Sequence, residues 1–337
     1  MAALITPRQA RYAAIAALIV GLFLCLQLGL IGALLGGLLV HELVHALAPR
    51  IAFMGDASRA RILSVGLIAT LVIGALVALG FGASALLRSE GASPAALLAR
   101  MADILQSSRA SLPAWITKYL PPDADSLSGI IVDWLRTHAA DLQHAGRIMG
   151  IGLVHLLLGM IIGAIICFRE ARAVGEKSLL LREGGERVRT LAEAFHNVVF
   201  AQVKISAVNT VLTAIYLVGI LPMLGVQLPL AKTLIAVTFL CGLLPVIGNL
   251  ISNTVIVVVS LSVSFVVAIG SLAFLIVIHK LEYFLNARIV GGEIKASAWE
   301  ILCAMIVFEA AFGLQGLVAA PIFYAYGKSE LRQLGLI

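Results

Sequence analysis

The sequence predicts an all-α integral membrane protein with about eight transmembrane helices and a re-entrant or broken helical hairpin near the C-terminus. Charged residues make up 12% of the chain and hydrophobic residues 61%, whereas a typical soluble domain carries about 25% charged residues. Uncharged apolar stretches of about 20 residues recur along the chain, and a helix of that length spans the hydrocarbon core of a bilayer. Composition and run length together favour helices embedded in lipid.

The N-terminal half predicts four spans and one polar segment outside the membrane. Residues 1–87 contain spans one to three, residues 88–146 form the external polar segment, and residues 147–204 contain span four and a cytoplasmic amphipathic loop. Arg11 precedes span one and Arg50 follows span two, so the positive-inside bias places both flanks in the cytoplasm. The expected spans are 12–28, 30–48, 62–87 and 147–168.

Residues 205–337 predict a C-terminal transport unit in which short connections join the spans. The expected spans are 205–224, 231–247, 249–269 and 271–290. Basic residues after the last span return the chain to the cytoplasm, so we expect both termini there. The remaining apolar stretch, 299–327, is broken near Gly313, and each half is too short to cross the bilayer alone. We therefore expect a re-entrant hairpin, or one bent pair pushed into the protein interior.

A second interruption lies in "LLPVIGNLISN", which contains Pro245 and Gly248. Interrupted helices at membrane depth are tolerated where the freed backbone groups face protein or a watery cavity, and they mark binding sites in transporters. Asn249 and Asn253 are one turn apart, so both amides can point to one side of this seam. They could bind a hydroxylated solute or a dehydrated cation, or they could merely cap the broken helix.

The stretches "LCGLLPVIGNLISNTV", "HKLEYFLNARIVGGEIKASAWE" and "IVFEAAFGLQGLVAAPIFYAYGKSEL" resemble the signature region of the autoinducer-2 exporter family of bacterial inner-membrane permeases. The resemblance covers residues 200–332, while the earlier part of the chain agrees in layout only. It implies a transporter of the inner membrane with eight membrane segments, assembled as a homo-oligomer, specifically a pentamer. The cargo is not identified by the resemblance, because family members are assigned to signalling-molecule export or to sodium/proton exchange.

Two carboxylates are candidates for the transport path. Glu282 matches the acidic residue that the family carries before its glycine-rich turn, and Asn286 lies on the same helical face; the alternative role for Glu282 is an interfacial ion pair. Glu309 lies in an apolar stretch with no basic residue within a turn. We therefore expect it to be buried in a protonated or cation-bound state, or as a neutral carboxyl bonded to the broken helix. Gln315 and Asn209 are weaker candidates.

The segment "VHELVHALAPR" contains His41, Glu42 and His45 in the H-E-x-x-H spacing of zinc-dependent peptidases. Such an enzyme needs a third ligand, commonly an acidic residue deep in another span, and the last aspartate, Asp141, lies in the external segment. The motif also falls at the cytoplasmic end of span two, where it lacks the expected structural context. We therefore reject a metal site and expect the protein not to be an enzyme.

The remaining features bear on energy source and partners. The pair Gly291 and Gly292 has neither the preceding strand nor the lysine of a phosphate-binding loop, so we expect no bound cofactor, and transport that is downhill or coupled to H⁺ or Na⁺. The net charge of +6 comes from basic residues at the ends of apolar segments, which indicates membrane topology rather than nucleic-acid binding. The four cysteines stand singly, with no C-x-x-C spacing.

Three functions follow in order of preference. The first is a secondary permease that exports a small polar solute of the autoinducer-2 class. The second is a cation/proton antiporter in which Glu309 or Glu282 exchanges H⁺ for Na⁺. The third, disfavoured for the reasons above, is a zinc-dependent intramembrane protease.

Overall fold

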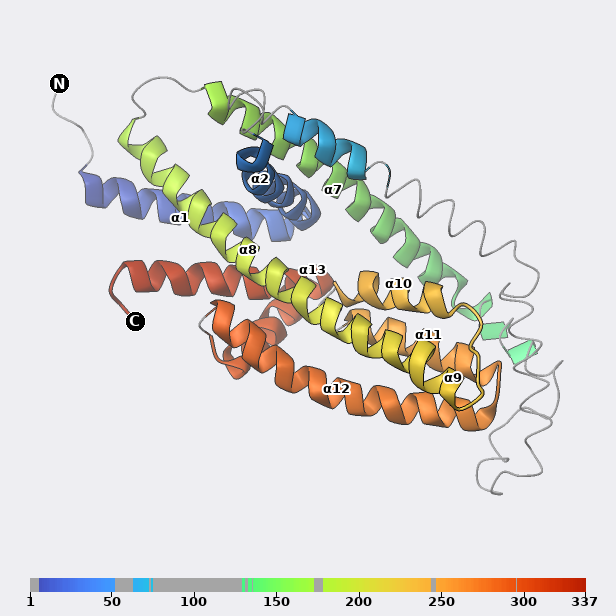
Figure 1. The fold of residues 1–337 in the computed structure, drawn as a ribbon. Helices are drawn as coiled ribbons and strands as arrows, with labels where there is room; N and C mark the ends of the chain where they lie inside the picture. The colour runs from blue at the N-terminus through green and yellow to red at the C-terminus, as the bar shows by residue number, and fades with distance from the viewer. Residues whose placement is uncertain are drawn as a thin grey trace. The chain divides into compact units, whose positions relative to one another are not determined.

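The computed structural model describes residues 6–51, 63–72, 74, 129–130, 133–134, 136–172, 178–243, 247–294 and 296–337. Within these ranges the regular structure is helical and contains no strand (Figure 1). Among the helices that the structure describes, five are long and apolar enough to cross a membrane. The prediction of a helical protein with membrane-spanning character is confirmed at this level. The count of eight crossings stays a prediction, since most of span three and of the external segment lies outside the described residues.

The chain forms two compact units that are discontinuous in sequence. The first unit contains Met1–Leu76, Ala145–Val199 and Val290–Ile337, and the second contains Val77–His144 and Phe200–Ile289. This grouping differs from the contiguous segments expected from the sequence. The reason is that three long helices, α7, α8 and α12, each run from one unit into the other.

The first unit is built from parts of five long helices. Their full bounds are α1 Pro7–Gln27, α2 Ile31–Ile51, α7 Ala139–Arg172, α8 Leu179–Ala214 and α13 Ala298–Gln333. Helix α1 begins at a capping box, in which the Thr6 hydroxyl accepts from the Gln9 amide and the Gln9 side chain accepts from the Thr6 amide. It ends before Gly29, whose φ of 71° turns the chain into α2. The turn therefore falls between the predicted spans one and two.

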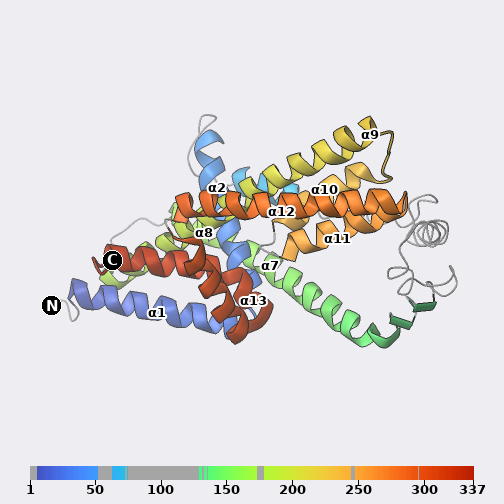
Figure 2. The ribbon, with the colours of Figure 1, turned by 90° about the horizontal axis from the view of Figure 1, so that it is seen from below.

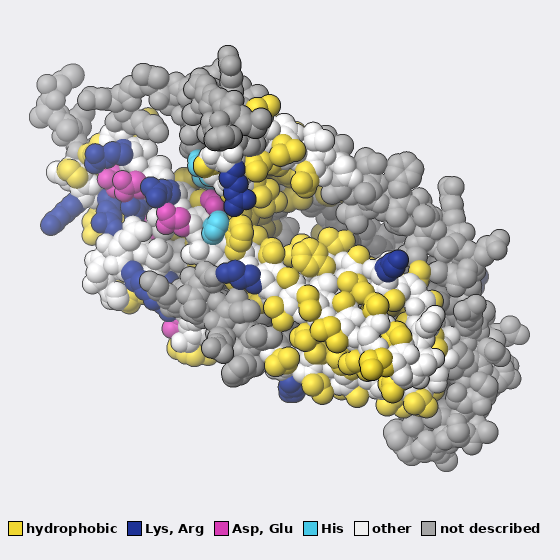
Figure 3. Space-filling model, in the orientation of Figure 1, with side chains coloured by type: hydrophobic (Ala, Val, Ile, Leu, Met, Phe, Trp, Pro, Cys, Tyr) yellow, Lys and Arg dark blue, Asp and Glu magenta, His cyan; other side chains and the backbone are white. Residues whose placement is uncertain are grey.

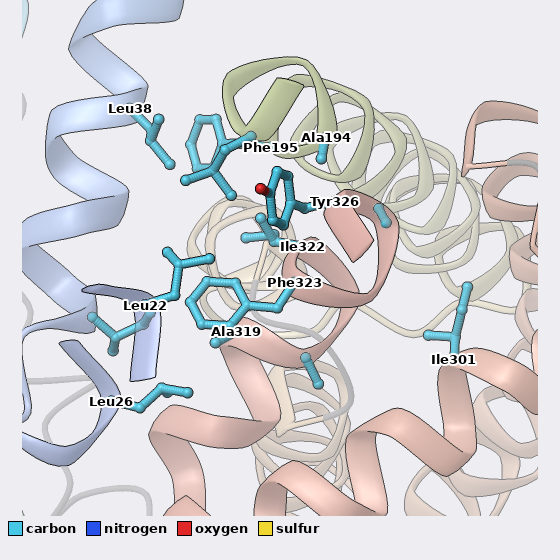
Figure 4. Close-up of a cluster of buried hydrophobic side chains, with 14 of the residues drawn as sticks. Leu22, Leu26, Leu38, Ala194, Phe195, Ile301, Ala319, Ile322, Phe323 and Tyr326 are labelled. Atoms are coloured by element: carbon cyan, nitrogen blue, oxygen red, sulfur yellow. The ribbon is translucent and has the colours of Figure 1, made fainter. Parts of the chain in front are cut away.

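Helix α1 and the C-terminal part of α13 lie side by side and antiparallel in the first unit (Figures 1 and 2). At one end the Arg11 guanidinium donates to the Gln333 carbonyl at 3.2 Å, and at the other the rings of Phe23 and Phe312 meet edge to face, with centroids 5.9 Å apart. A buried apolar cluster fills the space between α1, α2, α8 and α13 (Figure 4). Its members include Leu22, Leu26, Leu38, Phe195, Ala319, Ile322 and Tyr326.

Glycines bring α2 and α7 into backbone contact. A methyl group at Gly159 would overlap the Ala33 carbonyl, and one at Gly36 would overlap the Leu156 carbonyl. Gly32 and Gly36 on α2 have the small-xxx-small spacing that lets membrane helices approach closely. Gly159 and Gly163 on α7 have the same spacing. This packing joins the predicted spans two and four.

Helix α13 contains the predicted break. Gly313 has φ 63° and ψ −146°, which are not helical values, so the helix consists of two arms. The arms fold back on each other: Glu300 in the first arm accepts hydrogen bonds from Tyr324 Oη, at 2.7 Å, and from Lys328 Nζ in the second arm. The predicted break near Gly313 is observed. Its re-entry into a membrane stays a prediction.

The second unit packs the end of α8 against three further helices. Helix α8 continues as the π-helix η3, Ile215–Ile220, and the short α9, Leu221–Met223; then follow α10 Ala231–Gly242, α11 Ile247–Leu261 and α12 Phe265–Ile294. The expected amphipathic loop and the start of span five belong to one uninterrupted helix, α8. The expected spans six and seven are α10 and α11, which are shorter than a full crossing requires.

Hydrophobic side chains cover much of the second unit on the face shown in Figure 3. A lipid-facing surface needs such side chains because no water is present to solvate polar groups there. Exposed apolar residues of this unit include Val211, Ile215, Val218, Met223, Leu250, Val266, Ile269 and Val277. The buried face of the same helices carries polar side chains instead.

Candidate functional site

A stripe of neutral polar side chains runs along the inner face of α8 and of its continuation η3 in the second unit. Gln202, Ser206, Asn209, Thr213 and Tyr216 recur every three or four residues, which places them on one side of the helix. All except the half-buried Gln202 are buried. We call these five residues the α8 polar stripe.

The first two members bond the end of α10. Gln202 Nε2 donates to the Gly242 carbonyl at 2.6 Å, and Ser206 Oγ donates to the Phe239 carbonyl at 2.7 Å. Both acceptors belong to the last turn of α10, where carbonyls have no partner within their own helix. The stripe therefore satisfies the backbone groups that the interruption between α10 and α11 frees.

Asn209 joins the stripe to α11. Its Nδ2 donates to Asn249 Oδ1 at 3.1 Å, and Ser252 Oγ donates to the Asn249 carbonyl at 3.3 Å. Asn253, one turn further on, is half-buried, and its side chain makes no hydrogen bond with any residue that the structure describes. The two predicted asparagines thus differ: Asn249 is held by Asn209, and Asn253 has no side-chain hydrogen bond among the described residues.

The interruption itself is only partly described. Pro245 lies outside the described residues. Gly248 is buried, and a methyl group there would overlap the Cys241 carbonyl, so the start of α11 lies directly against the end of α10. Glycine is needed at this position because any side chain would separate the two helices.

The stripe ends in a chain of buried hydroxyls. Tyr216 Oη lies 3.0 Å from Ser271 Oγ on α12, which lies 2.7 Å from Ser260 Oγ on α11. The Tyr216 ring stacks on Phe274 with centroids 4.0 Å apart and an interplanar angle of 9°. Tyr216 belongs to the π-helix η3, and π-helical turns inside α-helices are frequent at functional sites.

The predicted carboxylates do not join this stripe. Glu282 and Asn286 lie in α12, and their side chains are outside the described residues. Glu309 is exposed on the first arm of α13, so its expected burial within the protomer is wrong. The reason is rotational: Phe308 and Phe312 turn the neighbouring face into the apolar cluster, and Glu309 lies about 100° around the helix from Phe308.

Gly313 and Gln315 occupy the tip of the α13 hairpin in the first unit. The Gln315 side chain packs against Gly29, in the turn between α1 and α2. The seam near Asn249 and the break near Glu309 belong to different units.

The H-E-x-x-H residues form a contact between α2 and α8. The Glu42 carboxylate accepts from His196 Nδ1 at 2.9 Å, and its other oxygen lies 3.5 Å from His41 Nδ1. His45 Nδ1 donates to the His41 carbonyl of its own helix at 2.8 Å. The part of the chain that the structure describes contains no group of three or more histidine, cysteine or acidic side chains arranged to hold a metal ion.

The sequence reasoning missed most of the stripe. Asn209 was predicted only as a weak candidate, and Gln202, Ser206, Thr213 and Tyr216 were not predicted. Their spacing of three or four residues within an apolar helix would have indicated one polar face. The groups that make these contacts are amides, hydroxyls and backbone carbonyls, which can donate to and accept from a neutral polar molecule.

In comparisons with known proteins, no family model, curated protein or solved structure matched this chain.

Proposed function

We propose that this protein is a secondary membrane permease that exports a small uncharged polar solute, of the sugar-like autoinducer-2 class. The observation that carries the proposal is the α8 polar stripe, which places neutral donors and acceptors in the interior of a unit whose exposed face is largely apolar. Polar groups are costly at membrane depth and are commonly functional when they occur there. The resemblance of residues 200–332 to exporter sequences supports the same class.

The hydrogen bonds of the stripe suit exchange with a solute. A hydrogen bond between neutral groups contributes a net stabilisation of only about 0.5–1.5 kcal/mol. A hydroxylated solute can take the place of Asn249 as the acceptor of the Asn209 hydrogen bond. The free energy of the complex then differs little from that of the empty site. Such a near-balanced exchange lets a solute enter a site and leave it again, and Asn253 supplies a further amide beside it.

The energy source and assembly follow from the sequence. Without a phosphate-binding loop, export is driven by the solute gradient or by coupling to H⁺ or Na⁺, and no cofactor takes part. In the arrangement that we propose, eight segments cross the bacterial inner membrane, α13 forms a re-entrant hairpin, both termini are cytoplasmic, and the protein is a homo-oligomer, specifically a pentamer.

Proteoliposomes loaded with radiolabelled ribose test the proposal. We expect Asn209→Leu and Asn249→Ala to lower the initial efflux rate by about 2- to 10-fold, the effect of one neutral hydrogen bond. The matched control is Thr254→Val, because Thr254 is exposed on α11 and its hydroxyl bonds only its own helix, at the Leu250 carbonyl. Equal efflux from all variants, or none from the wild type above empty liposomes, would contradict the proposal.

The second candidate is a cation/proton antiporter. The observation in its favour is Glu309, an acidic side chain exposed on an apolar arm beside Ile306 and Val307, where a charge is costly unless it is used. A pH-sensitive dye inside the vesicles distinguishes the two functions. Sodium-driven proton movement that disappears in Glu309→Gln would favour the antiporter over the solute permease.

A further inference from the structure

The second arm of the α13 hairpin is fixed to its neighbours by polar contacts. The Arg187 guanidinium on α8 donates to the Glu330 carboxylate and, at 3.1 Å, to Gln333 Oε1. The Arg11 guanidinium on α1 donates to the Gln333 carbonyl at 3.2 Å. The pair of Arg187 and Glu330 is buried, and a buried ion pair is costly to break. Helices α1 and α8 therefore hold the second arm in place.

The first arm, residues 298–312, is held mainly by apolar contacts. The Phe308 ring meets the Phe323 ring of the second arm edge to face, with centroids 6.1 Å apart. The outer face of the first arm exposes apolar side chains such as Leu302 and Ile306, as a surface in contact with lipid does. In a bilayer the hydrophobic effect does not drive helices together, because lipid chains can replace apolar contacts. The first arm is therefore less firmly held than the second.

One polar cluster joins the two arms at the open end of the hairpin. Glu300 Oε2 on the first arm accepts from Tyr324 Oη at 2.7 Å and from Lys328 Nζ. Lys328 Nζ also lies 5.7 Å from the centre of the Tyr324 ring. Hydrogen bonds that involve an ionised group are stronger than bonds between neutral groups. We call Glu300, Tyr324 and Lys328 the hairpin latch.

Gly313 lies at the opposite end of the first arm and can act as a pivot. Its φ of 63° is accessible to glycine without strain, and a methyl group there would meet nothing within 4 Å. Glu300 lies about 20 Å along the helix from Gly313, so a rotation of about 15° at the pivot moves Glu300 by about 5 Å. A small rotation is therefore enough to separate the members of the latch.

We propose that the first arm of α13 is a strap that pivots at Gly313 and is held closed by the hairpin latch. When the strap loses its contacts with Tyr324 and Lys328, it swings away from the second arm, and lipid chains replace the apolar contacts between the arms. Helix α12 runs from the second unit into the first and ends at Ile294, shortly before the strap begins. A movement of α12 is therefore transmitted along the chain to the strap. The proposal concerns the hairpin and does not depend on the cargo of the permease.

Double electron–electron resonance in nanodiscs tests the proposal. One spin label is attached to the native Cys303, which is exposed on the strap, and the other to Leu331→Cys on the second arm, with the other three cysteines replaced by alanine. We expect one short distance in the protein with an intact latch. Glu300→Gln removes the charge and keeps a side chain that can cap the helix, and Tyr324→Phe with Lys328→Met removes both donors. Each variant should increase the population with a distance longer by about 5 Å by about 10-fold or more, the effect of one hydrogen bond to a charged group.

The matched control is Glu193→Gln, because Glu193 is exposed on α8 and its carboxylate bonds Arg189 of the same helix at 3.1 Å. It should leave the distance between the arms unchanged. A second label pair, Val20→Cys and Leu331→Cys with Cys303 also replaced, measures the second arm against α1 and should not change in the latch variants. An unchanged distance between the arms in both latch variants overturns the proposal. Equal lengthening of the second label pair also overturns it, because the whole hairpin would then have moved.

Discussion

Replacing Gly159 by alanine should weaken the contact between α2 and α7. The added methyl group would overlap the carbonyl oxygen, carbonyl carbon and Cα of Ala33, which are backbone atoms that cannot rotate away. Overpacking of this kind costs about 1–3 kcal/mol, and the higher helix propensity of alanine returns up to about 1 kcal/mol. We expect a net loss of about 1–2 kcal/mol in the free energy of unfolding.

Gly150→Ala is the matched control for this prediction. Gly150 lies on the same helix, and a methyl group there would meet nothing within 4 Å, so helix propensity should leave the stability unchanged or raise it by up to about 1 kcal/mol. Equilibrium unfolding in mixed micelles, followed by circular dichroism against the fraction of denaturing detergent, gives both values. Equal stability of the two variants would refute the inference that backbone contact holds α2 to α7.

Three further outcomes are expected. Arg187→Ala should cost about 3–5 kcal/mol in the same unfolding assay, because it leaves Glu330 buried without the guanidinium that now lies 2.5 Å away; Arg187→Met with Glu330→Leu should recover most of that loss. Replacing His41 and His45 together by alanine should leave ribose efflux unchanged, and elemental analysis of the purified wild type should find no stoichiometric zinc; one zinc per chain, lost in the double variant, would revive the protease. Tyr216→Phe should cost about 1 kcal/mol of stability by removing one buried hydrogen bond, and no measurable loss would contradict the hydroxyl chain.

The helices were predictable because their signals are local. Apolar runs predicted α1, α2 and α13 to within a few residues at most ends, and Gly313 marked the break in α13 because glycine readily adopts a positive φ. The continuity of α8 was not predictable in the same way. Its N-terminal half carries charges and its C-terminal half is apolar, so composition suggested two elements where the backbone forms one.

The site was harder to predict because a site depends on which faces meet. Asn249 was recognised beside the seam, but its partner Asn209 lies 40 residues earlier, and only the fold brings the two amides together. Glu309 shows the opposite error. An apolar neighbourhood in sequence suggested burial, yet neighbouring residues on a helix point about 100° apart, so Glu309 is exposed while Phe308 is packed.

The kinds of polar contact differ between the two units, and this difference favours the second unit as the path of a neutral solute. In the first unit the described contacts include ion pairs such as Arg187 with Glu330 and His196 with Glu42. In the second unit the α8 polar stripe uses neutral groups throughout its described hydrogen bonds. Charged groups at membrane depth favour ions and protons, whereas amides and hydroxyls favour a neutral solute. Asn209→Leu, which removes a neutral donor from the second unit, should therefore reduce ribose efflux, whereas Arg187→Met with Glu330→Leu, which removes an ion pair from the first unit, should leave efflux unchanged. Equal loss of efflux in both variants, each still folded, would contradict the assignment of the solute path to the second unit.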